Sequence, residues 1–294
     1  MNLQLKLRIN HYTKEVSGMY GKSIELFLVN GSANSLITAE LSNWNGKAIK
    51  IPRIEVLECN RDDIKGAGVY FLFCKDDDGG DSVYVGESEN VIERLRQHLR
   101  DYQSGKEEFY WNTVVLFVGR DLNKALIRYL EDRLVKIVKE CGRYKVLTKN
   151  TYSKTVMKES QVASMEEFIE NIKILIAVLG YNVLTMIPKA TNDTKYLYCK
   201  GQTFSAKGFI SAGGLTVLKG AKVSDKTAPS FETKGKSYYR LRCQLEKDGT
   251  IVNGVFTKDY EFNAPSAASG VVMGRNSNGN LDWKDENGVS LKEL

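Results

Sequence analysis

The sequence lacks any apolar run long enough to cross a membrane, and it lacks internal repeats and low-complexity segments. The first absence excludes a protein built on membrane-spanning helices and the second excludes a repeat architecture. The opening segment, MNLQLKLRIN, alternates apolar and polar side chains. This alternation predicts a β-strand and not a signal peptide.

Cysteine and histidine are also scarce. Only five of the 294 residues are cysteines, and these are far apart with no CxxC pair; only two residues are histidines. Odd, widely spaced cysteines predict reduced thiols and a cytoplasmic protein, and they argue against a zinc site.

Basic residues are present in modest excess but are unevenly distributed. The net charge is +6, with eleven Lys/Arg against four Asp/Glu between residues 120 and 158, and thirteen against six between residues 186 and 260. Such clusters predict a face that binds a polyanion, because phosphate contacts supply most non-specific affinity for nucleic acids. Solvated helix faces give the same composition, and charge alone leaves both interpretations open.

The pattern of apolar residues predicts an α/β (α+β) protein with three parts. Residues 1–60 contain the strand-like runs IELFLV, LITAEL and KAIKIP between turn sequences, and we expect a separate N-terminal β unit with a scaffold or docking role. Residues 61–185 change in character and form the second part. The polar segment IPKATNDTK, near residues 187–195, precedes a third part at 196–294.

Within residues 61–185, strands and helices alternate. GVYFLFC and DSVYVG read as two strands joined by the turn KDDDGG, and a helix over 89–102 and the strand NTVVLFVG follow. A long helix over 122–141, with Asp121 as its N-cap and Gly142 as its end, precedes a further helix over 165–179. This order predicts a small, partly antiparallel sheet flanked by helices.

The third part reads as a small α/β unit. The segment 195–224 predicts two or three short strands, SYYRLRCQLEKDG a helix, and GVFTKDYEF a strand. Pro265 begins a short helix that Gly274 ends, and we expect Trp283 in the core.

Two tyrosines occupy the predicted hairpin, and a polar pair follows on the next helix. Tyr70 and Tyr84 lie on neighbouring strands, and Arg94 and His98 are four residues apart, so they share one helix face. That face borders the apolar stripe, so both side chains can point into a cleft at the edge of the core. Taken singly, each of these residues is an ordinary strand aromatic, helix charge or boundary histidine. Their shared spacing favours a functional cluster.

The triplets GVY and YVG, followed by Asn90, Arg94 and His98, resemble the GIY-YIG endonuclease domain of homing endonucleases, some restriction enzymes and the incision subunit of bacterial nucleotide-excision repair. RYLEDRLVK supplies Glu131 and KVLTKN supplies Asn150 at the family's later glutamate and asparagine. The resemblance covers residues 61 to about 155. It implies a GIY-YIG-type sheet and a metal-dependent endonuclease that acts on DNA, with RNA left open.

The resemblance also implies roles for these residues. Glu131 binds one divalent cation, Mg²⁺ or Mn²⁺, and Arg94 holds the scissile phosphate. Tyr70 is the preferred general base, His98 relays its proton and Tyr84 completes the pocket, although family members differ in which tyrosine acts. Because a free phenol has a pKa near ~10, a base role predicts a lowered tyrosine pKa. The remaining implied residues are substrate-binding: Gly68, Gly86, Asn90 and Asn150.

The sequence departs from the family pattern in its acidic residues. Glu87 stands where the repair enzymes have a lysine, and Glu89 and the acidic turn (Asp76, Asp77, Asp78 and Asp81) add negative charge. We expect these carboxylates to weaken phosphate binding. The alternative is therefore a nucleic-acid-binding or regulatory protein, such as a defence effector, with weak or conditionally activated nuclease activity.

The C-terminal segment resembles the end of a domain of unknown function that follows GIY-YIG domains in bacterial proteins. It is also similar to RAMA-type modules, which are proposed to associate with DNA modification and restriction systems. Its basic charge and Tyr196, Tyr198, Tyr238 and Tyr239 predict a nucleic-acid-binding module. A structural lid on the nuclease is the alternative.

Overall fold

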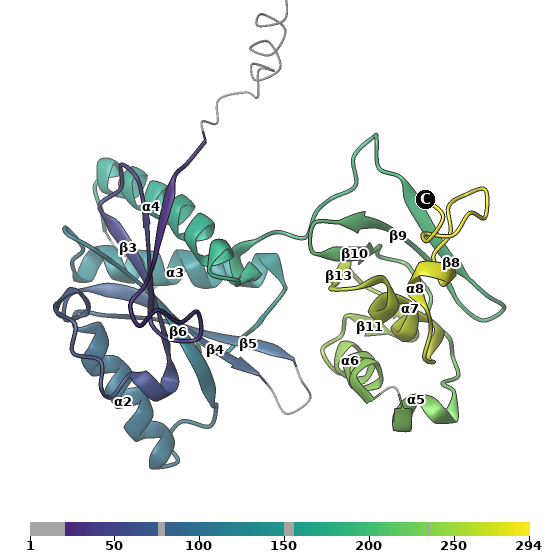
Figure 1. The fold of residues 1–294 in the computed structure, drawn as a ribbon, viewed down its shortest axis with the longest axis horizontal. Coiled ribbons are helices and arrows are strands. Elements are labelled where there is room, and N and C mark those ends of the chain that lie inside the picture. The colour runs from purple at the N-terminus through teal and green to yellow at the C-terminus, as the bar shows by residue number, and fades with distance from the viewer. Residues whose placement is uncertain (1–20, 76–79, 150–155, 235) are drawn as a thin grey trace, which may run out of the picture.

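The structure is a computed structural model that describes residues 21–75, 80–149, 156–234 and 236–294. A larger body surrounds a seven-stranded sheet, and a smaller C-terminal body surrounds a four-stranded sheet (Figure 1). The predicted α/β class is confirmed. The predicted strand at MNLQLKLRIN lies outside the described residues.

The large sheet has the strand order β1-β2-β3-β6-β4-β5-β7, in which every neighbouring pair is antiparallel except β5 and β7. The six strands predicted in the larger body are confirmed as β1 Ile24–Leu28, β2 Ile37–Leu41, β3 Gly46–Pro52, β4 Gly68–Lys75, β5 Asp81–Ser88 and β6 Trp111–Gly119. A short further strand, β7 (Lys145–Val146), was not predicted.

The N-terminal strands are not a separate unit. β3 pairs with β6 along its whole length, from Gly46 opposite Gly119 to Pro52 opposite Thr113, so β1 to β3 extend the same sheet. The predicted division at residue 60 therefore needs correction. Periodicity identifies strands but not their partners, and β3 buries side chains on both faces, with Ala48 in one core and Ile49 and Ile51 in the other.

Helices cover both faces of the large sheet (Figure 1). α2 (Val91–Gln103) packs on one face, and α3 (Lys124–Cys141) and α4 (Glu159–Val178) pack on the other. Alternate residues of β4 enter the two cores, with Val69 and Phe71 facing α3 and α4, and Tyr70 and Leu72 facing α2. Three short 3₁₀ turns, η1 (Arg53–Glu55), η2 (Asp62–Ile64) and η3 (Asn182–Leu184), complete this body.

The ends of the helices differ in part from the prediction. Asn123, not Asp121, is the N-cap of α3, and its side chain accepts hydrogen bonds from the backbone N–H groups of Ala125 and Leu126 at 3.0 and 3.2 Å. Gly142 ends α3 in the left-handed conformation (φ 64°), as predicted. α4 begins at Glu159 and not near residue 165 as predicted. The prediction missed the first turns because they are polar and lack an apolar period.

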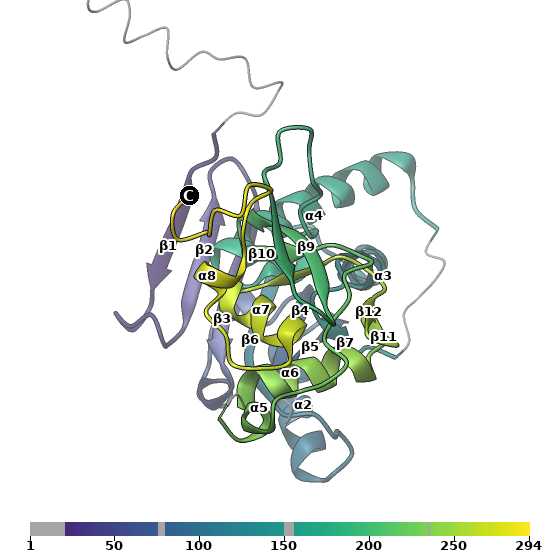
Figure 2. The same cartoon turned by 90° about the vertical axis from the view of Figure 1, so that its right-hand side faces the viewer.

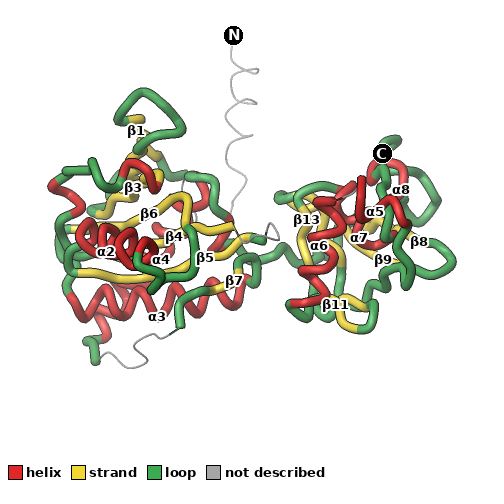
Figure 3. Tube along the Cα trace, turned by 90° about the horizontal axis from the view of Figure 1, so that it is seen from below, coloured by secondary structure: helices red, strands yellow, loops and turns green. Residues whose placement is uncertain are grey.

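The C-terminal body has the sheet order β13-β10-β9-β8, and α7 packs against this sheet (Figures 2 and 3). Trp283 is fully buried, as expected. The predicted single strand over residues 254–262 is two short strands with different partners. The helices α5 and α8 and the strand β11 were not predicted. The bounds are β8 Tyr196–Lys200, β9 Ser205–Ser211, β10 Gly214–Val217, α5 Pro229–Lys234, α6 Lys236–Lys247, β11 Ile251–Val252, β12 Val255–Phe256, β13 Tyr260–Phe262, α7 Pro265–Met273 and α8 Gly279–Asp282.

An ion pair connects the two bodies. Arg143, just after α3, pairs with Glu261 of β13, and its Nε donates to the carbonyl oxygen of Thr185 at 2.7 Å. The hairpin β4–β5 also reaches toward the C-terminal body (Figure 1), where Gly80 lies against the side chain of Gln244. In the part of the chain that the structure describes, no helix is both long and apolar enough to cross a bilayer.

Candidate active site

Tyr70 and Tyr84 lie close together on the face of the sheet that α2 covers. Their ring centroids are 6.3 Å apart, and Tyr70 is directly opposite Gly86 in the β4–β5 register. A Cβ atom at Gly86 would lie 2.5 Å from the Tyr70 hydroxyl oxygen. Gly86 is therefore required to seat the Tyr70 ring, because any side chain would displace it.

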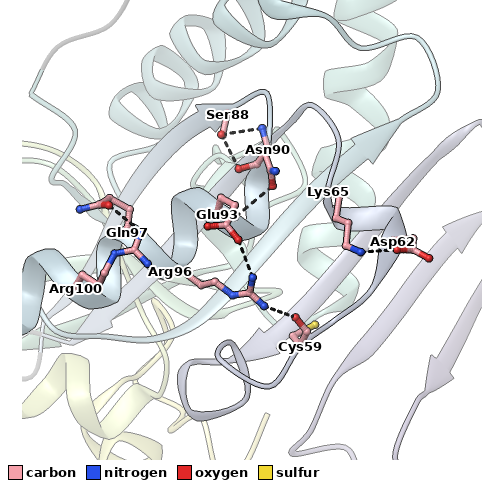
Figure 4. A network of polar contacts seen from close by, with 9 residues as sticks. All are labelled: Cys59, Asp62, Lys65, Ser88, Asn90, Glu93, Arg96, Gln97 and Arg100. Carbon is pink, nitrogen blue, oxygen red and sulfur yellow. Dashed lines mark hydrogen bonds and ion pairs between the residues drawn. The ribbon is translucent and has the colours of Figure 1, made fainter.

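Gly68 and Asn90 also have positioning roles in the structure. A Cβ atom at Gly68 would lie 2.5 Å from the Phe117 carbonyl oxygen, so this glycine permits the close approach of β4 and β6. Asn90 is the N-cap of α2 and accepts a hydrogen bond from the Glu93 N–H at 3.3 Å (Figure 4). The structure thus gives Gly68, Gly86 and Asn90 a local structural role, where the resemblance implied substrate contacts. Asn150 lies outside the described residues.

A chain of hydrogen bonds runs from Tyr70 into the protein. The Tyr70 hydroxyl is 2.9 Å from His98 Nε2, and His98 Nδ1 is 2.5 Å from Glu107 Oε2. His98 is 1% exposed and the Glu107 side chain 9%. A carboxylate only accepts, so Glu107 places the proton of a neutral His98 on Nδ1 and leaves Nε2 to accept from Tyr70.

Glu107 was missed by the sequence reasoning. It lies in the loop between α2 and β6, nine positions after His98, and no helical spacing connects the two. The predicted surface or boundary alternative for His98 is excluded, because the ring is fully enclosed and both nitrogens are hydrogen-bonded.

The guanidinium of Arg94 faces both phenols. It lies 3.9 Å from Asp101 Oδ2, and its hydrogen bonds and charge oppose a rise in the pKa of Tyr70 and Tyr84. Burial is nevertheless the dominant effect and raises both pKa values, that of Tyr70 well above its ordinary value. The lowered tyrosine pKa expected from a base role is therefore not found, since burial outweighs the cation.

Glu131 reaches the same region from α3. It is 6% exposed, and its Oε2 is buried with no hydrogen-bond partner in the described part of the chain. Burial first, and then the charge of Glu87, raise the pKa of Glu131 to about 7, against lowering by Lys124 and Arg128. Its helical neighbours Leu130 and Leu134 are buried.

The donor set at Glu131 fits a hard divalent cation. An orphaned carboxylate oxygen in a buried position needs a proton or a cation as its partner. Mg²⁺ binds through one or two carboxylates and keeps several waters. Among the described residues no group of three His, Cys, Asp or Glu side chains is arranged for a metal, so the protein would supply few of the ligands.

Glu87 does not present a free charge to the site. Both of its carboxylate oxygens accept from Lys124 Nζ at 2.9 Å, and its side chain is 6% exposed. Glu89 is more distant, 3.9 Å from the same ammonium, and mostly exposed. Lys124, at the start of α3, therefore neutralises the charge of Glu87.

Asp81, the one residue of the acidic turn that the structure describes, lies at the far end of β5 from Gly86. Asp81 begins β5, five residues before Gly86, which corresponds to about 17 Å along an extended strand. Its charge acts instead on Tyr144 and on Tyr260 of the C-terminal body. The expected weakening of phosphate binding by Asp81 is not supported by this geometry; Asp76, Asp77 and Asp78 lie outside the described residues.

A separate groove of about 1350 Å³ lies between the sheet and the start of α4, lined by Trp44, Lys47, Arg120 and Phe168 among others. It includes none of the predicted site residues. The candidate site residues therefore lie outside this groove.

One face of the C-terminal sheet gathers tyrosines and lysines. Tyr196 and Tyr198 alternate on β8; Lys207 Nζ lies 3.5 Å from the Tyr196 ring centroid, and Lys200 Nζ lies 4.7 Å from that of Tyr198. Tyr238 instead packs into the core of this body, so it is not part of the same surface.

Residues 197–294 match the family model of DUF4357, described as a domain of unknown function. No curated protein and no solved structure matches the chain. The matched segment defines the C-terminal body as this module type. It does not reach residues 61–155, so the resemblance to GIY-YIG endonucleases rests on the residues themselves.

Proposed function

We propose that this protein is a metal-dependent DNA endonuclease of the GIY-YIG type that hydrolyses phosphodiester bonds, with the DUF4357 module adding DNA affinity or target choice. The observation that carries the proposal is the buried chain from the Tyr70 hydroxyl to His98 (2.9 Å) and Glu107 (2.5 Å), together with the Arg94 guanidinium beside Tyr70 and the unpartnered buried oxygen of Glu131. A phenol, a guanidinium and an orphaned buried carboxylate have no shared structural purpose. Together they suit water activation, phosphate binding and metal binding.

The relay accounts for base chemistry without a free phenolate. The Tyr70 hydroxyl donates a hydrogen bond to His98 Nε2, and a lone pair of its oxygen then accepts a hydrogen bond from water. As that water attacks phosphorus, its proton passes to the Tyr70 oxygen while the Tyr70 proton passes to His98. Glu107 stabilises the imidazolium that forms. The raised pKa of Tyr70 is compatible with this role, because the phenol is neutral before and after the transfer.

The other groups act on the phosphate. The planar fork of Arg94 suits two phosphate oxygens. Glu131 would hold Mg²⁺ or Mn²⁺, which supplies charge stabilisation for the leaving 3′ oxygen. The Tyr196 and Tyr198 face of the module offers aromatic rings and ammonium groups, the combination that binds bases and phosphates of a nucleic acid strand.

Plasmid nicking with Mg²⁺ tests the proposal, with Glu131→Ala and Arg94→Ala compared with the wild type. Glu170→Gln is the matched control, because Glu170 is a largely exposed glutamate on α4 that pairs with Lys173. We expect loss of nicking in the first two variants only. Equal cleavage by wild type and Glu131→Ala, or no cleavage of any DNA or RNA by any form, would refute an active nuclease.

The second candidate is a conditionally active nuclease with a regulatory role. It is favoured by the pKa of about 7 at Glu131, because a proton then competes with the cation near neutral pH. In this case nicking at fixed low Mg²⁺ rises steeply with pH through about 7 and becomes less pH-dependent at high Mg²⁺. A flat pH dependence at low Mg²⁺ would remove this candidate.

A further inference from the structure

We propose that Asp101 is a positioning residue of the candidate active site, which holds Arg94 with its carboxylate and the loop that carries Glu107 with its backbone carbonyl. The proposal deepens the roles of Arg94 and of the relay in the proposed function and rests on them. Asp101 lies near the end of α2, seven residues after Arg94 and three after His98. The three side chains therefore share one face of the helix.

The first observation is the pairing of the Asp101 carboxylate with Arg94. Asp101 Oδ2 lies 3.9 Å from Arg94 Nη1, and the two side chains are 21% and 38% exposed. This separation exceeds that of a direct hydrogen bond, so the carboxylate attracts and orients the guanidinium without occupying its donors. The donors of Arg94 thus remain available to phosphate oxygens.

The carboxylate is itself held in place by α2. The side-chain amide of Gln97 donates to Asp101 Oδ1 at 2.8 Å. Arg100 Nη2 in turn donates to Gln97 Oε1 at 2.8 Å (Figure 4). One oxygen of Asp101 is therefore fixed by the helix and the other is left to face Arg94. Supporting contacts of this kind set the orientation of a functional side chain.

The second observation is the way in which α2 ends. Gly105 is in the left-handed conformation (φ 73°), and its N–H donates to the Tyr102 carbonyl at 3.1 Å. The N–H of Lys106 donates to the Asp101 carbonyl at 2.9 Å. These two bonds form a Schellman motif, which needs a residue that adopts positive φ readily. The N–H of Glu107 donates to the same Asp101 carbonyl at 3.2 Å, so the residue after the motif is also tied to the helix end.

The helix end directs Glu107 back to the relay. Its Oε2 lies 2.5 Å from His98 Nδ1, although nine positions separate the two residues. Asp101 thus contacts both the group that would hold the phosphate and the backbone of the group that would stabilise the imidazolium. Attack on phosphorus requires the phosphate and the base at a fixed separation, and one residue that holds both fixes it.

Asp101→Asn and Asp101→Glu test the carboxylate in the full chain. Both keep the backbone carbonyl and therefore the end of α2. Asparagine keeps an acceptor for Gln97 but loses the charge that faces Arg94, whereas glutamate keeps the charge, and its extra methylene can span the 3.9 Å. With rates normalised to folded protein, we expect plasmid nicking by Asp101→Asn to lose about 10- to 100-fold in kcat with little change in KM, and Asp101→Glu to change less than about threefold.

A second readout of the carboxylate needs no activity. The exchange of the Arg94 guanidinium protons with water is measured by NMR on ¹⁵N-labelled protein, with Arg94→Lys to assign the signal. We expect exchange to be several-fold faster in Asp101→Asn and unchanged in Asp101→Glu, because only the former loses the charge that restrains the guanidinium.

Gly105→Val tests the carbonyl and the loop. Valine is strained at positive φ, and Gly31→Val is the matched control, because Gly31 (φ 66°) lies in the β1–β2 turn and, like Gly105, meets no neighbour within 4 Å. The short bond between His98 Nδ1 and Glu107 gives a strongly deshielded proton signal. We expect Gly105→Val to shift or abolish this signal and to lower nicking about tenfold or more, and Gly31→Val to leave both unchanged.

Equal kcat and equal proton exchange in wild type and Asp101→Asn, or a loss in Asp101→Glu as large as in Asp101→Asn, would overturn the role of the carboxylate. An unchanged His98 signal in Gly105→Val would overturn that of the carbonyl. The positioning role and the nuclease fail separately. A wild type that nicks no nucleic acid refutes the nuclease, while the two NMR signals still decide the positioning; a wild type that nicks plasmid no better than Asp101→Asn refutes the positioning role alone.

Discussion

Replacing Glu131 by glutamine should stabilise the protein above neutral pH, although it removes the proposed metal ligand. Burial and Glu87 raise the pKa of Glu131 from 4.5 to about 7. A shift of this size corresponds to about 3 kcal/mol, because each pKa unit is worth about 1.4 kcal/mol. The ionised carboxylate is therefore less favourable in the folded protein than in the unfolded chain by roughly this amount, an upper value because partial relaxation lowers it.

The sign of the pH dependence follows from the protons bound. Between pH 4.5 and about 7 the folded state keeps the Glu131 proton and the unfolded state has lost it, so folding stability falls as pH rises through this window and stays lower above it. Glutamine does not titrate and lacks this loss. The stability difference between Glu131→Gln and wild type should thus grow by about 2.5 kcal/mol in favour of the variant from about pH 5 to about pH 8.

Urea unfolding in a chelating buffer at both pH values measures this difference. Hydrogen exchange read on peptides from α3 and β4 assigns the transition to the larger body, because the two bodies need not unfold together. Parallel pH dependence in the two proteins would show that Glu131 titrates as an ordinary exposed carboxylate, and the argument for an orphaned buried acid would fail. Greater stability together with lost nicking would mark Glu131 as a site residue maintained at a cost to folding.

Three further predictions concern the relay, the hairpin and the module. Glu107→Gln should lower the nicking rate about 100-fold and alter its pH profile, because general-base assistance accelerates a reaction by about that factor. Glu108→Gln, at the exposed neighbouring position, should leave the nicking rate and its pH profile unchanged. Equal effects of the two substitutions would remove Glu107 from the relay. Gly86→Ala should destabilise the fold by about 1–3 kcal/mol, because its methyl group overpacks against Tyr70, and should reduce nicking. Gly66→Ala, whose methyl group meets open space, should have little effect on stability or nicking. Tyr198→Ala should weaken single-stranded DNA binding by about 1–3 kcal/mol, measured by fluorescence anisotropy; unchanged affinity would favour the lid role of the module.

The sequence was sufficient for the strands and helices that carry the site, because their signals are local. GVYFLFC, DSVYVG and NTVVLFVG are short β-rich runs between turns, and the stripe that includes Leu95 and Leu99 sets the face of α2. Tyr70 and His98 were placed together by strand pairing and helical spacing, and the structure joins them at 2.9 Å.

What the sequence could not provide are partners that meet only in three dimensions. Glu107 faces His98 from a loop, and Lys124 faces Glu87 from another element, 37 positions along the chain. No periodicity connects such pairs. The assignment of β1 to β3 as a separate unit failed for the same reason, since β3 finds its partner in β6 beyond two intervening strands and a helix.

The raised pKa values of Tyr70, Tyr84 and Glu131 have one common cause. Burial is the largest contribution to all three, and in each case it favours the neutral group. In the proposed nuclease, the site would gain its charges together with its ligands: a cation would make the Glu131 carboxylate favourable, and a phosphate would pair with Arg94. The relay would carry a proton from water toward His98, away from the phosphate. Because Glu87 is paired with Lys124, it would not present a free negative charge to a phosphate in the proposed nuclease.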